Sequence, residues 1–158
     1  MKALLIAALA ITPMIAAPAF AADEVNVAPG ITAAGAPLAL RGNDPVSLVD
    51  GGKVVKGSAD YAATHEGAAY YFASEANMKA FEANPAKFAP EHGGFCSYGV
   101  SVGKKFDGDP NQFLVQNGRL FVFLNAATRT AFLKDAQGNE TAADKQWDKI
   151  EHTAVSDL

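Results

Sequence analysis

The sequence predicts an α+β domain in which a small antiparallel sheet, built from hairpins, packs with two or three helices. Three observations lead to this prediction. Apolar runs of strand length are separated by short turns that contain glycine. Other segments carry apolar residues at helical spacing behind capping residues. The chain has 158 residues, 49% of them hydrophobic, which suits one domain with its own core.

Residues 1–21 have the composition of a signal peptide. Lys2 gives a positive start, residues 3–11 form an apolar stretch, and small residues flank Phe20. Prolines break the stretch before it reaches the length of about 18 to 20 residues that a membrane-spanning helix needs. We therefore expect cleavage after Ala21. The exported product is expected to be periplasmic and free, because no cysteine for lipid attachment follows the cleavage site.

The charge balance argues against two classes of partner. Without residues 1–21 the 13 basic residues fall to 12, because Lys2 is lost, and they face 17 acidic ones for a net charge of −5. Nucleic acids and anionic membranes bind clustered lysines and arginines, and this sequence has no such cluster. We expect neither a nucleic-acid partner nor a membrane partner.

The chain beyond the signal peptide divides into a lead-in and one domain. Residues 22–41 mix alanine, proline and glycine without a period and predict an extended lead-in, and residues 42–158 are expected to form the domain. Residues 44–55 and 109–122 share the order Asp-Pro, strand, glycine turn, strand. Such patterns arise by chance, so no internal repeat is predicted.

Three pairs of strands are predicted around glycine turns: residues 46–49 with 53–57, 61–65 with 68–72, and 113–116 with 119–124. Asn117-Gly118, in the last pair, is the strongest hairpin signal of the chain. Both faces of residues 119–124 are apolar, which favours a central position for this strand.

Three helices are predicted, over residues 75–83, 125–135 and 141–154. Ser74 is expected to cap the first helix, whose Met78 and Phe81 face the core. Gly138 is expected to end the second helix. The third helix is expected to dock on the sheet through one apolar stripe, made of Ala143, Trp147, Ile150 and Ala154.

The least regular segment, residues 91–105, contains the single cysteine, Cys96. An exported protein with one cysteine has no internal disulfide, so packing must provide its stability. The lone thiol is then inert and buried, a metal ligand, a site of mixed disulfides or a link between two copies.

His92 and Cys96 form the candidate metal site. They are four residues apart, and a thiolate together with an imidazole suits copper or zinc. Further ligands would have to come from His65, Met78 or a carboxylate. The structural alternative is that Cys96 is a small buried side chain and His92 belongs to a surface loop.

A second chemical alternative is a thiol nucleophile. His92 would act as the base for Cys96, and Asp107 or Asp109 would orient the imidazole. The sequence has no glycine-rich phosphate loop, no serine nucleophile elbow and no HExxH pair, so no enzymatic activity is predicted.

Aromatic residues are frequent around the Cys96 segment: Tyr70, Tyr71, Phe72, Phe88, Phe95 and Tyr98. Core packing explains them most simply. The alternative is an aromatic-walled pocket with Cys96 at its edge, which would receive a small ligand or a loop of a partner.

From Asp44 to about Phe88 the chain resembles the YHS domain family, whose relatives include the TRASH-type metal-binding domains. The resemblance lies in the order of fixed points: Asp44-Pro45-Val46, Gly67, Tyr71-Phe72, Ser74, Phe81 and Pro85. A longer match, over about residues 40–150, is similar to the exported YHS domain-containing proteins of bacteria. Its parts are residues 72–90, residues 93–105, the strand pair after Pro110 and the helix of Trp147.

The metal-binding members of the wider family carry cysteine at three positions, which in this chain are Ser47, Ala73 and Asn77. None of these side chains replaces a thiolate, so the soft-metal role does not carry over on them. The resemblance implies a periplasmic accessory protein that binds or handles copper or zinc through Cys96 and His92. The alternative is a metal-free module that kept the scaffold and binds a periplasmic protein or a small ligand.

Overall fold

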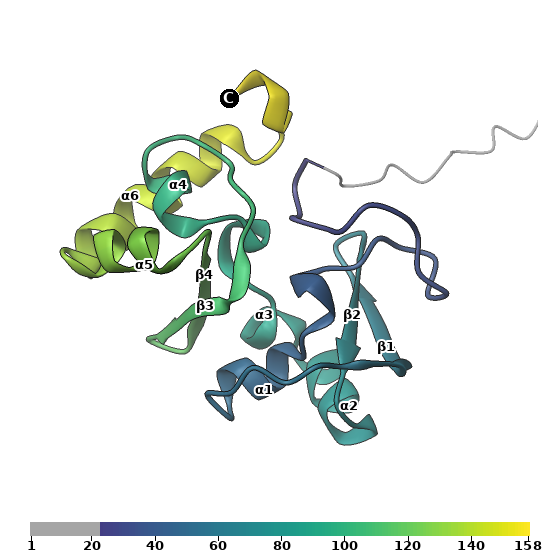
Figure 1. Cartoon of the computed structure of the whole chain (residues 1–158). Coiled ribbons are helices and arrows are strands. Elements are labelled where there is room, and N and C mark those ends of the chain that lie inside the picture. The colour runs from purple at the N-terminus through teal and green to yellow at the C-terminus, as the bar shows by residue number, and fades with distance from the viewer. Residues whose placement is uncertain (1–22) are drawn as a thin grey trace, which may run out of the picture.

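A computed structural model describes residues 23–158, and the predicted signal peptide lies outside the described residues. The described chain folds into short helices and two antiparallel sheets of two strands each. The predicted α+β class is therefore confirmed, although the hairpins form two small sheets instead of one. Figure 1 shows the two sheets in separate halves of the molecule, each with its own helices.

The half on the right of Figure 1 comes first in the sequence. Its elements are the 3-10 turn η1 (Leu40–Gly42), helix α1 (Pro45–Val49), strands β1 (Ser58–His65) and β2 (Ala68–Phe72), and helices α2 (Glu75–Ala83) and α3 (Pro85–Phe88). Before η1, residues 23–39 hold no helix or strand and join the fold through isolated bridges, Val27 with Ala39 and Leu38 with Ala69.

The other half contains the later elements. These are the 3-10 turn η2 (Glu91–Gly94), helix α4 (Ser97–Ser101), strands β3 (Asp109–Gln116) and β4 (Arg119–Phe123), helices α5 (Ala126–Leu133) and α6 (Ala136–Ile150), and the 3-10 turn η3 (Val155–Asp157). Parallel bridges from Pro90 and Cys96 flank β4 on the side away from β3. Strand β4 is thus enclosed, as its two apolar faces predicted.

The two halves repeat one structural unit. Every pair in the β1–β2 register has a counterpart in the β3–β4 register 51 positions later, from Ser58–Phe72 and Asp109–Phe123 to His65–Ala68 and Gln116–Arg119. Both hairpins carry an irregularity at the same place and turn through two residues with positive φ. We call residues 38–83 the first unit and residues 90–133 the second unit.

The turns before the hairpins repeat as well. Leu40, Arg41 and Gly42 have positive φ, as do His92, Gly93 and Gly94, 52 positions later. The short helices α1 and α4 follow at the same spacing, with Asp44 and Cys96 at their N-caps. The comparison of residues 44–55 with residues 109–122 therefore missed this structural repeat, because it aligned the two Asp-Pro pairs and not the left-handed turns.

The first predicted hairpin, residues 46–49 with 53–57, is wrong. Residues 45–49 form helix α1, because the side chain of Asp44 accepts hydrogen bonds from the amides of Val46 and Ser47. Pro45 at the first helical position has the backbone angle that a helix start needs. Residues 53–57 form only an isolated bridge between Lys56 and Asn43. The Asp-Pro-Val sequence is thus a helix start.

The other two hairpins and the first helix agree with the predictions. The hairpins around Glu66-Gly67 and Asn117-Gly118 are present, and helix α2 spans the predicted residues 75–83. Ser74 caps α2 by accepting from the amide of Asn77. Phe81 is buried in the core and Met78 packs against it.

The two last helices differ from the prediction in their bounds. Helix α5 ends at Leu133 and Gly138 lies in the first turn of α6, where its amide donates to Asp135. Helix α6 ends at Ile150, so Ala154 of the predicted stripe lies beyond it. The stripe docks on Phe95 and Val100, next to α4, and not on a sheet.

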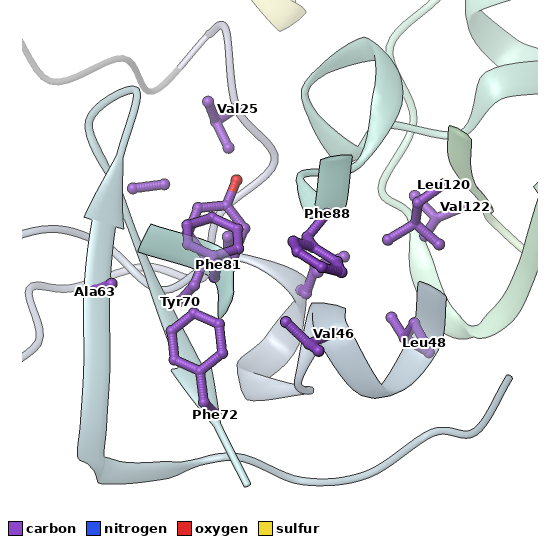
Figure 2. Close-up of a cluster of buried hydrophobic side chains, with 13 residues drawn as sticks. Val25, Val46, Leu48, Ala63, Tyr70, Phe72, Phe81, Phe88, Leu120 and Val122 are labelled. Atoms are coloured by element: carbon purple, nitrogen blue, oxygen red, sulfur yellow. The ribbon is translucent and has the colours of Figure 1, made fainter. Parts of the chain in front are cut away.

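The largest apolar cluster joins both units. It contains Tyr70, Phe72 and Phe81 of the first unit and Leu120 and Val122 of the second. Figure 2 shows Leu48 of α1 on the same side of this cluster as Leu120 and Val122, and α1 contacts β4. None of the helices between residues 23 and 158 is long and apolar enough to cross a bilayer.

Candidate functional site

The three positions at which the metal-binding relatives carry cysteine meet at one buried carboxylate. Asp44 has no exposed surface, and its Oδ2 accepts from the hydroxyl of Ser47 at 2.9 Å, the amide of Ala73 at 3.0 Å and Nδ2 of Asn77 at 2.5 Å. Its Oδ1 accepts from the amides of Val46 and Ser47. The carboxylate thus joins α1, α2 and the end of β2.

This arrangement is closed to a metal ion. A soft-metal site needs thiolate or imidazole ligands, and these positions supply only a hydroxyl, a backbone amide and a side-chain amide. All three groups donate to Asp44 and present hydrogen atoms to the centre of the site. Hydrogen bonds to a carboxylate therefore occupy the place where the relatives would use thiolates.

The second unit has a different group at the equivalent place. Cys96 corresponds to Asp44 and has no exposed surface. It packs in a cluster with Phe121, Phe123 and Phe132. Of the aromatic set predicted from the sequence only Tyr98 packs against this cluster. The cluster that joins the two units contains Tyr70, Phe72 and Phe88, the α4–α6 contact contains Phe95, and Tyr71 is half-buried outside these clusters.

His92 is buried and both of its ring nitrogens have partners. Its side chain is 1% exposed. Nδ1 lies 3.1 Å from the hydroxyl of Ser97, and Nε2 lies 3.0 Å from Oδ1 of Asp144 on α6. The imidazole is therefore oriented by Asp144 and not by Asp107 or Asp109, which the thiol-nucleophile hypothesis had proposed.

Burial determines the protonation of His92. Desolvation lowers the pKa of its imidazole, and the hydrogen bond and charge of Asp144 oppose this effect without cancelling it. The pKa of Asp144 is itself lowered, first of all by its hydrogen bonds with Arg119. A neutral imidazole beside a charged carboxylate is the state that these environments favour.

Arg119, at the start of β4, forms ion pairs with three surrounding carboxylates. Its guanidinium lies 2.6 Å from Glu91, 2.7 Å from Glu140 and 2.8 Å from Asp144. The hydrogen bonds with Glu91 and Asp144 raise the pKa of the guanidinium. The resulting network fastens η2 and α6 to the second hairpin.

Three members of this network, Arg119, Glu91 and Asp144, line a cleft of about 790 Å³. Its walls come from residues 24–25, the tip of the first hairpin, the segment from α3 to η2, and α6. Six carboxylates line it: Glu24, Glu66, Glu91, Asp144, Asp148 and Glu151. We call it the acidic cleft.

The charges of the acidic cleft do not balance. Arg119 is the one lysine or arginine among its lining residues, against six carboxylates. Burial lowers the pKa of the His92 imidazole in its wall, so this residue does little to offset the negative charge. A concave surface with this excess of negative charge attracts cations.

Among the residues that line the acidic cleft, sequence reasoning singled out His92 and His65 as candidate ligands and missed Arg119 and Asp144. Nothing near Arg119 in the sequence distinguishes it from a surface arginine at a hairpin. Its partner Asp144 is 25 positions away, within the helix predicted over residues 141–154. The only local signal was the left-handed turn with the Gly93-Gly94 pair, which holds His92.

The described residues offer no donor set for a metal centre. Among residues 23–158 no three histidine, cysteine, aspartate or glutamate side chains are grouped so that they could hold an ion. Cys96 lies in an aromatic cluster and His92 uses both nitrogens elsewhere. The described residues do not fit a copper or zinc centre in this conformation, and metal binding by Cys96 and His92 stays a prediction.

Comparison with known proteins gives one match. The family model of the YHS domain matches residues 45–92, which cover the first unit from α1 onward, α3 and the start of η2. The fixed points of the resemblance from Pro45 to Pro85 lie inside this range. No curated protein and no solved structure matches the chain.

Proposed function

We propose that the protein is an exported, non-enzymatic binding module that captures an organic cation in the acidic cleft. The YHS domain model matches residues 45–92, and this domain type suggests a metal-related role. The ligand of the module is a lysine- or arginine-rich peptide segment or a small polyamine, which share the ammonium and guanidinium chemistry that carboxylates bind.

The observation that carries the proposal is the charge of the acidic cleft. Glu91 and Asp144 are partnered by Arg119, whereas Glu66 and Asp148 are exposed and form no ion pair with a lysine or arginine of residues 23–158. Two carboxylates on different elements, the tip of the first hairpin and α6, can therefore bind a ligand that spans the cleft.

The spacing of the carboxylates favours an extended ligand. A single metal ion needs three or more ligands around one point, and the described residues offer no such group. Positive charges spread along a chain match carboxylates spread along the walls of a cleft. Trp147, also in the wall, offers an aromatic surface to a cationic group.

Binding of a fluorescent lysine-rich peptide to the purified exported protein tests the proposal. We expect saturable binding that weakens as salt is added, because exposed charges are screened. A double variant, Glu66→Gln with Asp148→Asn, should lower affinity about tenfold, which corresponds to about 1.4 kcal/mol. Free polyamine added as a competitor distinguishes the two ligand sources.

The matched control is Asp60→Asn with Glu82→Gln. Both residues are exposed and lie outside the acidic cleft, and the double variant has the same net charge as the cleft variant. Equal weakening by the two double variants would mean that binding follows net charge alone. Absence of peptide binding in the wild type would remove the proposal.

The YHS match favours one second candidate, handling of a soft metal through Cys96 and His92. Binding would require the release of Ser97 or Asp144 from the imidazole and access to the buried thiol. Titration with copper(I) or zinc decides this candidate when wild type, Cys96→Ser and His92→Ala are compared. Affinity that is unchanged in Cys96→Ser would exclude it.

Export is part of the proposal and has its own measurement. Residues 1–21 carry the features of a signal peptide, and Asp23 and Glu24 begin the described fold directly after them. Intact mass of the protein from a periplasmic extract should correspond to a chain that begins at Ala22. A mass that includes residues 1–21 would contradict it.

A further inference from the structure

We infer that residues 23–28 act as a strap which completes one wall of the acidic cleft and whose release admits the ligand. The inference rests on the proposed function and concerns the regulation of that cleft. We call these residues the strap.

The strap is fastened to the second unit and to the C-terminal segment. The amide of Asn26 donates to the carbonyl of Gly93 at 2.8 Å, and the carbonyl of Asp23 accepts from the ammonium of Lys105. The carboxylate of Glu24 lies 2.6 Å from Nδ1 of His152. These contacts bring the strap against η2 and the end of α6.

The same residues are fastened to the first unit. Val25 is 4% exposed and belongs to the core cluster of Tyr70 and Phe81, and Figure 2 shows it above these rings. The amide of Ala28 donates to the carbonyl of Leu38 at 2.8 Å. Glu24 and Val25 line the acidic cleft, so the strap both bridges the units and forms part of the binding surface.

Gly93 is needed where the strap passes over η2. A Cβ at this position would lie 1.9 Å from the carbonyl oxygen of Glu24. The equivalent residue of the first unit, Arg41, carries a side chain in the same left-handed conformation. The turn alone therefore tolerates a side chain, and it is the strap that excludes one at residue 93.

Two features make the closed strap easier to release than the rest of the fold. Nδ2 of Asn26 is the one buried side-chain nitrogen or oxygen among residues 23–158 without a hydrogen-bond partner. The ammonium of Lys105 is held among carbonyls of Asp23, Glu151 and Thr153, and burial lowers its pKa. Opening would hydrate both groups, which favours local opening over global unfolding.

Hydrogen exchange of backbone amides tests whether the strap opens. In the wild type the amide of Asn26 should exchange at least about tenfold faster than that of Phe121 in β4, because local opening exposes it without global unfolding. Gly93→Ala should accelerate Asn26 further. The matched control, Gly118→Ala, has the same left-handed strain but open space around its Cβ, and should leave Asn26 unchanged. Equal exchange of Asn26 and Phe121 would overturn the inference.

A crosslink tests whether opening admits the ligand. Glu24→Cys and His152→Cys, in a Cys96→Ala background, are joined by a short bifunctional maleimide, and the control is the same variant capped with N-ethylmaleimide. The labelled lysine-rich peptide should associate at least about tenfold more slowly with the joined protein, because local opening limits its entry. The joined and the capped protein carry the same substitutions, so they do not differ in charge at positions 24 and 152.

The outcomes separate the two proposals. Equal association rates in the joined and the capped protein would overturn the strap as a gate and leave the cleft as the binding site. Binding to neither sample, nor to the wild type, would overturn the proposed function and the gate together. Slower association with the joined protein, together with fast exchange of Asn26, supports both.

Discussion

The two units have the same backbone arrangement, but the buried polar side chain and the buried less polar one exchange positions between them. At the N-cap of the short helix the first unit has the buried carboxylate of Asp44, and the second has the buried thiol of Cys96. At the first left-handed position of the preceding turn the relation is reversed, with buried Leu40 in the first unit and buried His92 in the second.

This reversal shows that the hairpin register does not depend on one polar centre. Asp44 is stable in the interior because five hydrogen bonds reach its two oxygens. The thiol of Cys96 is stable in the interior because it packs among phenylalanines and, unlike a carboxylate, has little need of a hydrogen-bond partner. The polar residue of the second unit, His92, instead faces α6 and the acidic cleft.

The largest effect is expected from Asp44→Ala. It leaves the donors of Ser47, Ala73 and Asn77 unpaired in the interior and removes the cap of α1. We expect a loss of about 4 kcal/mol in the free energy of unfolding, measured by denaturant titration. Asp44→Asn keeps the cap acceptor and should lose about half as much. A loss below about 1 kcal/mol for Asp44→Ala would mean that the network is dispensable.

Trp147→Ala should follow with a loss of about 3 kcal/mol, in the range for truncation of an aromatic residue that packs on a core. Trp147 packs on the cluster of Phe95 and Val100 and holds α6, an element without a counterpart of its length in the first unit. Trp147→Phe is the control and should retain most of the stability. If Trp147→Ala changes the denaturant midpoint only slightly, α6 is peripheral to the fold.

Cys96→Ser should cost about 2 kcal/mol, because it buries a hydroxyl among aromatic rings that offer it no acceptor. Cys96→Ala should cost less, because it removes only the sulfur atom. The native thiol should react slowly with a labelling reagent and rapidly after unfolding. Rapid labelling of the native protein would contradict the burial on which both expectations rest.

The smallest effect is the pH dependence that His92 gives to the second unit. Burial lowers the pKa of its imidazole below the ordinary value, so the folded state binds this proton less well than the unfolded state. The contribution to stability is present above a pH of about 6.5 and is lost as the pH falls from there through the folded pKa.

The measurement is the free energy of unfolding between pH 8 and pH 5. His92→Leu copies Leu40 of the first unit and should flatten the curve over this range, whereas His152→Gln, at a side chain that is 76% exposed, should keep the wild-type slope. Identical slopes for the wild type and His92→Leu would assign the pH dependence to other groups.

The elements that the sequence determined by itself are those whose signals lie within a few residues. The turns Glu66-Gly67 and Asn117-Gly118 each have glycine at the second position, where positive φ is required, and the flanking residues alternate or remain apolar. Ser74 caps α2 through a hydrogen bond that spans three positions. Such interactions are complete within the segment, so local sequence predicts them.

Tertiary contacts decided the rest. Residues 46–49 have the composition of a strand, but Asp44 caps them as a helix and is itself held in place by Ala73 and Asn77, about thirty positions away. The acidic cleft combines Glu24, Glu66, Arg119 and Asp144 from four separate segments. The sequence gives their charges, but it does not give their distances, because only the packing of the two units on each other and on α6 brings these groups together.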